Sequence, residues 1–192
     1  GDFSRFDVVV LGIRAYETRP DLAAANDRLL SFAGDGGTVI VQYNKYEYPQ
    51  GGFAPYPVAM ARPHDRVSDE KVPVRILAPE HPVFLQPNLV SQEDFEGWAQ
   101  ELGLYFLSEW DSRYTPLLAM ADPGEEPKRG GLVVAPVGEG VYVYTGLAFF
   151  RQFPQGIPGA YRLFANLLSL RGQEPTDPGS VEHGHRSGAR PG

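Results

Sequence analysis

The side chains of this chain that could bind or react follow its predicted buried strands. An arginine and a tyrosine come after the apolar run 6–11, and a polar, aromatic turn comes after the run 38–42. In open α/β sheets, ligands bind beyond the carboxyl ends of the strands, so we expect these groups to converge on one crevice. Arginine and asparagine could hold a carboxylate or sugar hydroxyls there, and tyrosine could stack on a sugar ring. The predicted ligand-binding residues are Arg14, Tyr16, Asn44, Tyr46 and Arg151.

A structural role is the alternative for these residues. The two arginines would then pair with local acids, and the tyrosines would pack beneath the long segment 46–63. A second set, Asp94, Trp98 and Trp110, has the composition of a carbohydrate-stacking site. Tryptophan packs in cores and interfaces more often, so we expect packing there.

Two histidines are candidates for acid–base chemistry because imidazole titrates near neutral pH. His64 lies in the string Arg-Pro-His-Asp-Arg, and His81 lies between Glu80 and Pro82. Carboxylates that could assist them are Asp65, Asp69 and Asp94. A turn or helix-capping role is the alternative for both histidines.

The composition excludes several classes of function. The chain has no cysteine, which rules out disulfides, thiolate zinc sites and a cysteine nucleophile. It contains no phosphate loop, no dinucleotide-binding glycine motif, no serine nucleophile elbow and no zinc-protease motif. A net charge of −7 argues against a nucleic-acid partner, and no run is long enough to span a membrane. We therefore predict no catalytic residue, no metal site and no cofactor. The chain shows no signal-peptide pattern, and the sequence assigns no compartment.

The elements that must position the strand-end residues form a β-α-β unit. Residues 6–11 are continuously apolar, which is typical of a central parallel strand covered on both faces. A helix is predicted from Pro20 to the glycines at 34–37, followed by a strand at 38–42. The whole predicts an α/β fold with a mostly parallel sheet.

The rest of the chain adds shorter elements. The proline-rich segment 46–63 argues against helix, and the capping box at Ser91–Asp94 predicts a short helix through residue 102. Two runs joined by Gly-Glu-Gly predict an antiparallel hairpin at an edge of the sheet. An amphipathic helix at 159–170 ends the predicted domain, 1–170, and residues 171–192 are predicted to be a disordered tail. The further predicted strands are 72–77, 104–107, 132–137 and 141–145.

Four strings in this chain resemble a module of long bacterial proteins described as PIG-L (LmbE-like) deacetylases. They are residues 9–16, 36–44, 94–98 and 159–167. The module looks like a class I glutamine amidotransferase-like domain, distantly similar to ThuA-type proteins. The resemblance implies a flavodoxin-like three-layer fold in which the usual N-terminal strand–helix–strand is missing or shortened. It also implies that zinc-dependent deacetylation belongs to a separate N-terminal domain, and that parent protein could be exported.

Three hypotheses of function follow. The first is a non-catalytic accessory domain that binds carbohydrate or a partner domain, such as the deacetylase domain. The second is a ThuA-like sugar-modifying enzyme or hydrolase that uses His64 or His81 with nearby carboxylates. The third is a purely structural or oligomerisation domain. The missing nucleophile favours the first, because the strand-end turn carries Tyr43 and Asn44 where an amidotransferase would carry cysteine.

Overall fold

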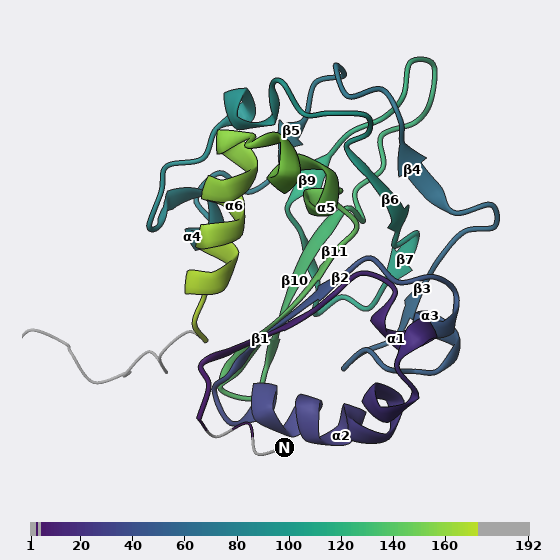
Figure 1. Ribbon diagram of the computed structural model, residues 1–192, viewed down its shortest axis with the longest axis vertical. Helices are drawn as coiled ribbons and strands as arrows, with labels where there is room; N and C mark the ends of the chain where they lie inside the picture. Colours follow the sequence, from purple (N-terminus) through teal and green to yellow (C-terminus); the bar gives the residue numbers. More distant parts are fainter. Residues whose placement is uncertain (1–2, 4, 173–192) are drawn as a thin grey trace, which may run out of the picture.

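The core of the protein is a five-stranded mixed sheet with the order β1-β2-β11-β10-β8, as seen in a computed structural model that describes residues 3 and 5–172 (Figure 1). β1, β2 and β11 run parallel, whereas β10 is antiparallel to both β11 and β8. The fold is therefore α/β, but only one end of the sheet is parallel. The strands are β1 (Val8–Leu11), β2 (Thr38–Gln42), β8 (Thr115–Pro116), β10 (Leu132–Val137) and β11 (Gly140–Thr145).

Two predicted strand positions are wrong. The run 6–11 forms β1, but β1 lies at an edge of the sheet, where Val10 is 38% exposed. The hairpin β10–β11 forms as predicted, but it lies inside the sheet because β11 pairs with β2 and β10 pairs with β8. An apolar run shows that a strand is covered by side chains and does not show how many strands flank it.

A helix covers each face of the sheet (Figure 1). Side chains alternate along β2, so that Val39 and Val41 face one way and Ile40 faces the other. α2 (Pro20–Gly34) packs Leu29 and Ala33 on the first face. α6 (Pro158–Ser169) packs Leu163 and Leu167 on the second face. The two long predicted helices are confirmed, and Tyr161 and Leu168 on the outer side of α6 are 50% and 37% exposed.

The end of α2 and the turn of the hairpin are in close backbone contact at glycine residues. The backbone N–H of Glu139 donates to the Gly34 carbonyl at 2.9 Å. A Cβ on Gly138 would lie 2.4 Å from that carbonyl oxygen, and Gly138 also has a φ of 55°. Only glycine accepts this combination without strain, so the Gly-Glu-Gly turn docks directly on the helix end.

Apart from β8, the segment between β2 and β10 forms short elements outside the main sheet. The predictions for this region need correction. A one-turn helix, α3 (Glu47–Gln50), forms despite the prolines, with Pro49 in its last turn. The capping box at Ser91 is present, but it opens a 3-10 turn, η1 (Gln92–Phe95), that ends well before residue 102 because Gly97 adopts a φ of 74°. The predicted strand 72–77 shrinks to β5 (Arg75–Ile76).

The remaining elements are small. Three two-stranded sheets pair β3 with β7, β4 with β6 and β5 with β9. Their strands are β3 (Val58–Ala59), β4 (Asp65–Val67), β6 (Gly103–Phe106), β7 (Glu109–Trp110) and β9 (Leu118–Ala119). The other helices are α1 (Ala15–Thr18), α4 (Pro82–Leu85), α5 (Phe149–Gln152) and η2 (Phe153–Gln155).

The predictions of no membrane span, a disordered tail and no metal site can be compared only with the residues that the structure describes. No helix within residues 3 and 5–172 is long and apolar enough to cross a membrane. The predicted tail, 171–192, lies outside the described residues from position 173 onward. Within the described part of the chain, no group of three histidine, aspartate or glutamate side chains is placed to hold a metal ion.

Candidate ligand-binding site

The turns after β1 and β2 are held together by a buried asparagine. The side-chain oxygen of Asn44 accepts the backbone N–H of Tyr16 at 2.9 Å, and its amide nitrogen donates to the Gln42 carbonyl at 2.9 Å. Asn44 is completely buried. Both hydrogen-bonding ends of this side chain are therefore used inside the protein.

Tyr16 is also internal. Its hydroxyl donates to the side-chain oxygen of Asn26 at 2.6 Å, and its ring stacks on Phe53 with centroids 4.3 Å apart. Phe53 belongs to the long segment 46–63, so this tyrosine packs beneath that segment. Of the five predicted ligand-binding residues, Tyr16 and Asn44 thus face the interior.

Arg14 lies at the protein surface with a local acid. It adopts the left-handed conformation with a φ of 56°, and its guanidinium donates two hydrogen bonds to Glu17 at 2.7 and 2.8 Å. Lys45 donates to the same carboxylate at 3.0 Å. Hydrogen bonds from Arg14 and then Lys45 lower the pKa of Glu17 to about 2. This pairing matches the structural alternative for Arg14, whose side chain nonetheless remains 43% exposed.

Beyond the strand ends, five rings form what we call the aromatic cluster: Tyr43, Tyr46, His64, Tyr105 and Phe150. Tyr105 is at its centre, with centroids 3.7 Å from His64 and 5.7 Å from both Tyr43 and Tyr46. Phe150 lies 5.5 Å from Tyr43. Tyr43 is buried, whereas the other four rings are half-buried. The exposed Arg62 lies 3.8 Å over the Tyr46 ring, in a cation–π arrangement.

The position of Tyr105 comes from an irregularity in the chain. β6 pairs with β4 through a register shift, and Tyr105 adopts a φ of 50°, which is rare for a bulky residue. The Tyr144 hydroxyl in β11 donates to the Tyr105 carbonyl at 2.7 Å. The described residues with positive φ other than glycine are Arg14, Gln100 and Tyr105, and all three are in or beside this region. Backbone strain of this kind concentrates at functional sites.

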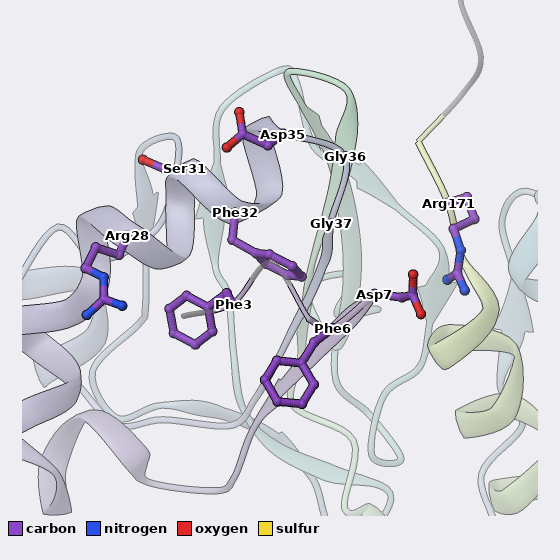
Figure 2. A pocket seen from close by; sticks show the side chains of 10 residues that line it. All are labelled: Phe3, Phe6, Asp7, Arg28, Ser31, Phe32, Asp35, Gly36, Gly37 and Arg171. Atoms are coloured by element: carbon purple, nitrogen blue, oxygen red, sulfur yellow. The ribbon is translucent and has the colours of Figure 1, made fainter. Parts of the chain in front are cut away.

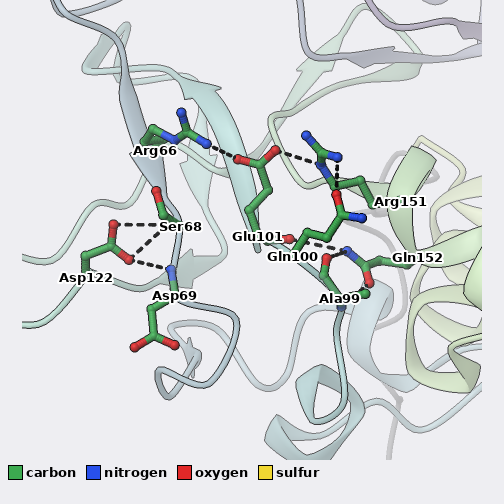
Figure 3. A network of polar contacts seen from close by, with 9 residues as sticks. All are labelled: Arg66, Ser68, Asp69, Ala99, Gln100, Glu101, Asp122, Arg151 and Gln152. Carbon is green, nitrogen blue, oxygen red and sulfur yellow. Dashed lines mark hydrogen bonds and ion pairs between the residues drawn. The ribbon is translucent and has the colours of Figure 1, made fainter.

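Next to the aromatic cluster, two arginines share one buried carboxylate (Figure 3). Arg66 from β4 donates to Glu101 at 2.5 Å, and Arg151 from α5 donates to the other oxygen at 2.7 Å. Glu101 is only 3% exposed, whereas the Arg66 and Arg151 side chains are 48% and 34% exposed. Arg151 also bonds Gln100. This arrangement again matches the pairing alternative for Arg151.

The charges and rings belong to one region. Burial is the main cause that raises the pKa of the Tyr43 phenol, while Arg14 and Arg151 act to lower it and Glu101 acts to raise it. Burial lowers the pKa of His64, and the Arg66 charge lowers it further. Arg14 and Arg151 both act on Tyr43, and Tyr46 lies against Tyr105, so these three of the five predicted residues lie around the same rings. Sequence reasoning missed Arg66, Glu101 and Tyr105 as members of this region.

The two candidate histidines have different surroundings. His81 is a capping residue, as its structural alternative predicted, because its Nδ1 accepts the Val83 N–H at the start of α4. His64 stacks on Tyr105, and its buried Nε2 has no hydrogen-bond partner within the described residues. Two of the assisting carboxylates have other contacts: Asp94 pairs with Arg162, and Asp69 accepts the Lys71 N–H.

Only Asp94 and Trp98 of the second predicted set are brought together. Trp98 is 2% exposed and donates its indole N–H to the Asp94 carbonyl in the core beneath α6. Trp110 packs against the core on the other face of the sheet. The packing alternative therefore applies to Trp98.

Two pockets lie away from the strand-end region. One of about 540 Å³ opens at the residues that precede β1 and β2, and Figure 2 shows the rings of Phe3, Phe6 and Phe32 gathered in it. Another of about 530 Å³ lies between residues 70–74 and the η1 region. Neither is lined by any of the five predicted residues.

Comparison with known proteins finds solved structures of similar fold. No profile of a known protein family matches the chain, and no curated protein matches its sequence. Among solved structures, it is similar to the cytoplasmic protein STM3548 from Salmonella typhimurium, with a TM-score of 0.56 and 17% identity over 89% of this chain and 74% of that one. It is also similar to the cytoplasmic protein STM1381 from Salmonella typhimurium LT2, with a TM-score of 0.53 and 18% identity over 86% and 72%. A β-galactosidase from Rahnella sp. R3 aligns with 88% of this chain and 23% of its own length, at a TM-score of 0.45 and 14% identity.

Proposed function

We propose that this chain is a non-catalytic accessory domain that binds a carbohydrate at the aromatic cluster and its arginines. The proposal keeps the resemblance to the flavodoxin-like, three-layer module of PIG-L/LmbE-like deacetylases, whose deacetylase domain is the expected neighbour in a longer protein. The observation that carries it is the half-buried aromatic cluster beside arginines at the carboxyl side of the parallel strands.

The chemistry of these groups suits sugar binding. Aromatic rings present apolar faces to the C–H groups of a pyranose, and guanidinium N–H groups donate to its oxygens. Arg62 is exposed, and it pairs with no carboxylate among the described residues. Its displacement from Tyr46 would uncover a ring face for a ligand.

The strand-end turn supports a binding role over catalysis. A nucleophile would have to lie at Tyr43 or Asn44 in a domain of this kind. Tyr43 is 7% exposed and lies against Tyr105, and Asn44 is completely buried with both ends of its amide bonded. Neither can reach a substrate without repacking the region.

NMR titration tests the proposal. Millimolar D-glucose or D-glucuronate should shift backbone amide signals near Tyr46 and Tyr105, and Tyr46→Ala should weaken binding about fivefold, since a stacked ring contributes roughly 1 kcal/mol. Tyr161→Ala is the matched control because Tyr161 is an exposed tyrosine on α6. Titrations without shifts at the aromatic cluster would refute carbohydrate binding.

One observation favours a second candidate, a ThuA-like sugar-modifying enzyme. His64 Nε2 is buried with no hydrogen-bond partner in the part of the chain that the structure describes, and it lies in the field of Glu101, which suits a group that exchanges protons with a substrate. Sugar turnover that disappears in His64→Gln while the fold is retained would establish this candidate over the first.

A further inference from the structure

We infer that Arg66 and Arg151, held by Glu101, bind a carboxylate on the ligand, so that the carbohydrate is an acidic one of the uronic acid class. This inference rests on the proposed function and narrows its substrate class. The three residues come from β4, the segment before β6, and α5, and they meet only in the fold.

The arginines have hydrogen-bond donors left over. Arg66 uses one terminal nitrogen on Glu101, and Arg151 uses its Nε on Glu101 and one terminal nitrogen on Gln100. Each guanidinium carries five N–H groups in a planar fork that fits a carboxylate with two parallel bonds. Figure 3 shows the two guanidinium groups approaching the Glu101 carboxylate from opposite sides. Donors from both arginines are therefore available to a second carboxylate.

The charge balance favours an anion. Among these three residues, two guanidinium groups against one carboxylate leave a charge of +1, in a chain whose net charge is −7. Burial, and then Arg66, lower the pKa of His64, which disfavours its charged form. The half-exposed arginines keep this excess charge near solvent, where a ligand can reach it.

The pair is fixed in place before a ligand arrives. Gln152, which is completely buried, accepts the Ala99 N–H at 2.7 Å and donates to the Ala99 and Glu101 carbonyls at 3.2 and 3.3 Å. The Asp122 carboxylate accepts the backbone N–H groups of Ser68 and Asp69, which follow β4 (Figure 3). Side chains held in their bound position lose less entropy on binding, so this support raises affinity.

The arginine pair adjoins the aromatic cluster on both sides. The Arg151 guanidinium lies 5.0 Å from the Phe150 ring, which in turn lies 5.5 Å from Tyr43. On the other side, the charge of Arg66 acts on His64, which stacks on Tyr105. A sugar bound at the rings could therefore place an acidic group at the arginines.

The test compares three ligands by NMR titration of the full chain: D-glucuronate, D-glucose and acetate. Glucuronate should bind about tenfold more tightly than glucose, as expected for charge-assisted hydrogen bonds. Arg66→Gln and Arg151→Gln should each abolish this preference, and Arg66→Lys should retain part of it, since lysine keeps the charge and loses the fork. Arg113→Gln, which removes an exposed arginine paired with Asp111, should change nothing.

The outcomes separate this inference from the proposed function. Equal binding of glucose and glucuronate would overturn acid recognition and leave carbohydrate binding intact. Equal binding of acetate and glucuronate at the arginines, with no shifts at the rings, would keep the carboxylate site and overturn carbohydrate binding. Titrations in which no ligand shifts a signal would overturn both.

Discussion

Two neighbouring regions of this protein use polar side chains in opposite ways. Around Asn44, the polar groups are buried and bonded to each other: Asn44 bonds the turns after β1 and β2, and Tyr16 bonds Asn26. Around Glu101, two half-exposed arginines share a carboxylate and keep donors for other partners. The first region holds the turns after β1 and β2 together, and the second lies at the surface beside the aromatic cluster.

The difference reflects what each group can still bind. A buried polar atom without a partner costs free energy, so the Asn44 region must be closed to be stable. An exposed guanidinium is satisfied by water, and a ligand can replace that water at little cost. The Asn44 region therefore has a structural role, whereas recognition by the arginines and rings is our proposal, and stability measurements can separate the two.

Asn44→Ala should give the largest loss of stability. The substitution removes the side-chain partners of the Tyr16 N–H and the Gln42 carbonyl. At roughly 1–3 kcal/mol for each unpaired buried group, the free energy of unfolding should fall by about 3 kcal/mol. Urea denaturation measures this.

Lys45→Ala is the control for that variant. Lys45 is the next residue, but its ammonium makes a surface ion pair with Glu17, which typically contributes less than about 1 kcal/mol. Equal losses in the two variants would contradict the assignment of the structural role to Asn44.

A pair of buried tyrosine hydroxyls should give an intermediate effect. Tyr48 and Tyr142 lie on the same side of the sheet as Asn44, and their hydroxyl oxygens are 2.9 Å apart. Tyr48→Phe leaves the buried hydroxyl of Tyr142 without this partner and should lower the free energy of unfolding by about 1.5 kcal/mol. The double variant with Tyr142→Phe should recover most of that loss, because neither hydroxyl of the pair remains. Additive losses in this double-mutant cycle would show that the hydroxyls do not interact.

Much of the main sheet could be predicted from the sequence because the signals are local. The helix from Pro20, the strand 38–42 and the hairpin all follow from apolar spacing and from glycine positions. The order of strands could not be predicted, since it depends on which distant segments pair. In the structure, β1 is therefore an edge strand rather than a central one, and the hairpin lies inside the sheet rather than at its edge.

The candidate site was harder to predict for the same reason. Arg66 and Glu101 are 35 residues apart, and Arg151 lies 50 residues beyond Glu101. Their meeting depends on the pairing of β4 with β6 and on the position of α5, which no motif marks. The strand-end rule identified Asn44 as a residue that follows β2. Because Asn44 is completely buried, its amide bonds to the protein itself.

Arg66→Gln should affect stability less than the buried substitutions do. Glu101 keeps Arg151 as its partner, and the Arg66 side chain is 48% exposed, so the loss in the free energy of unfolding should be about 1 kcal/mol. Urea denaturation of this variant beside Asn44→Ala compares the two regions directly. A loss for Arg66→Gln as large as that of Asn44→Ala would break the comparison, because it would make the arginine pair part of the structural framework.

The smallest expected effect is a change in the titration of His64. Its pKa in the folded protein lies below the ordinary value of about 6.5, mainly because of burial and further because of Arg66. A histidine whose pKa is lower in the folded state binds its proton more readily when unfolded, so stability falls as the pH drops through about 6.5. In Arg66→Gln, NMR titration should show the His64 midpoint rising toward that value. His81 is the internal control, since its lowered pKa has burial as the main cause and involves no arginine. A midpoint that stays in place, or that moves equally for both histidines, would remove Arg66 from the surroundings of His64 and leave only Arg151 of the pair beside the rings.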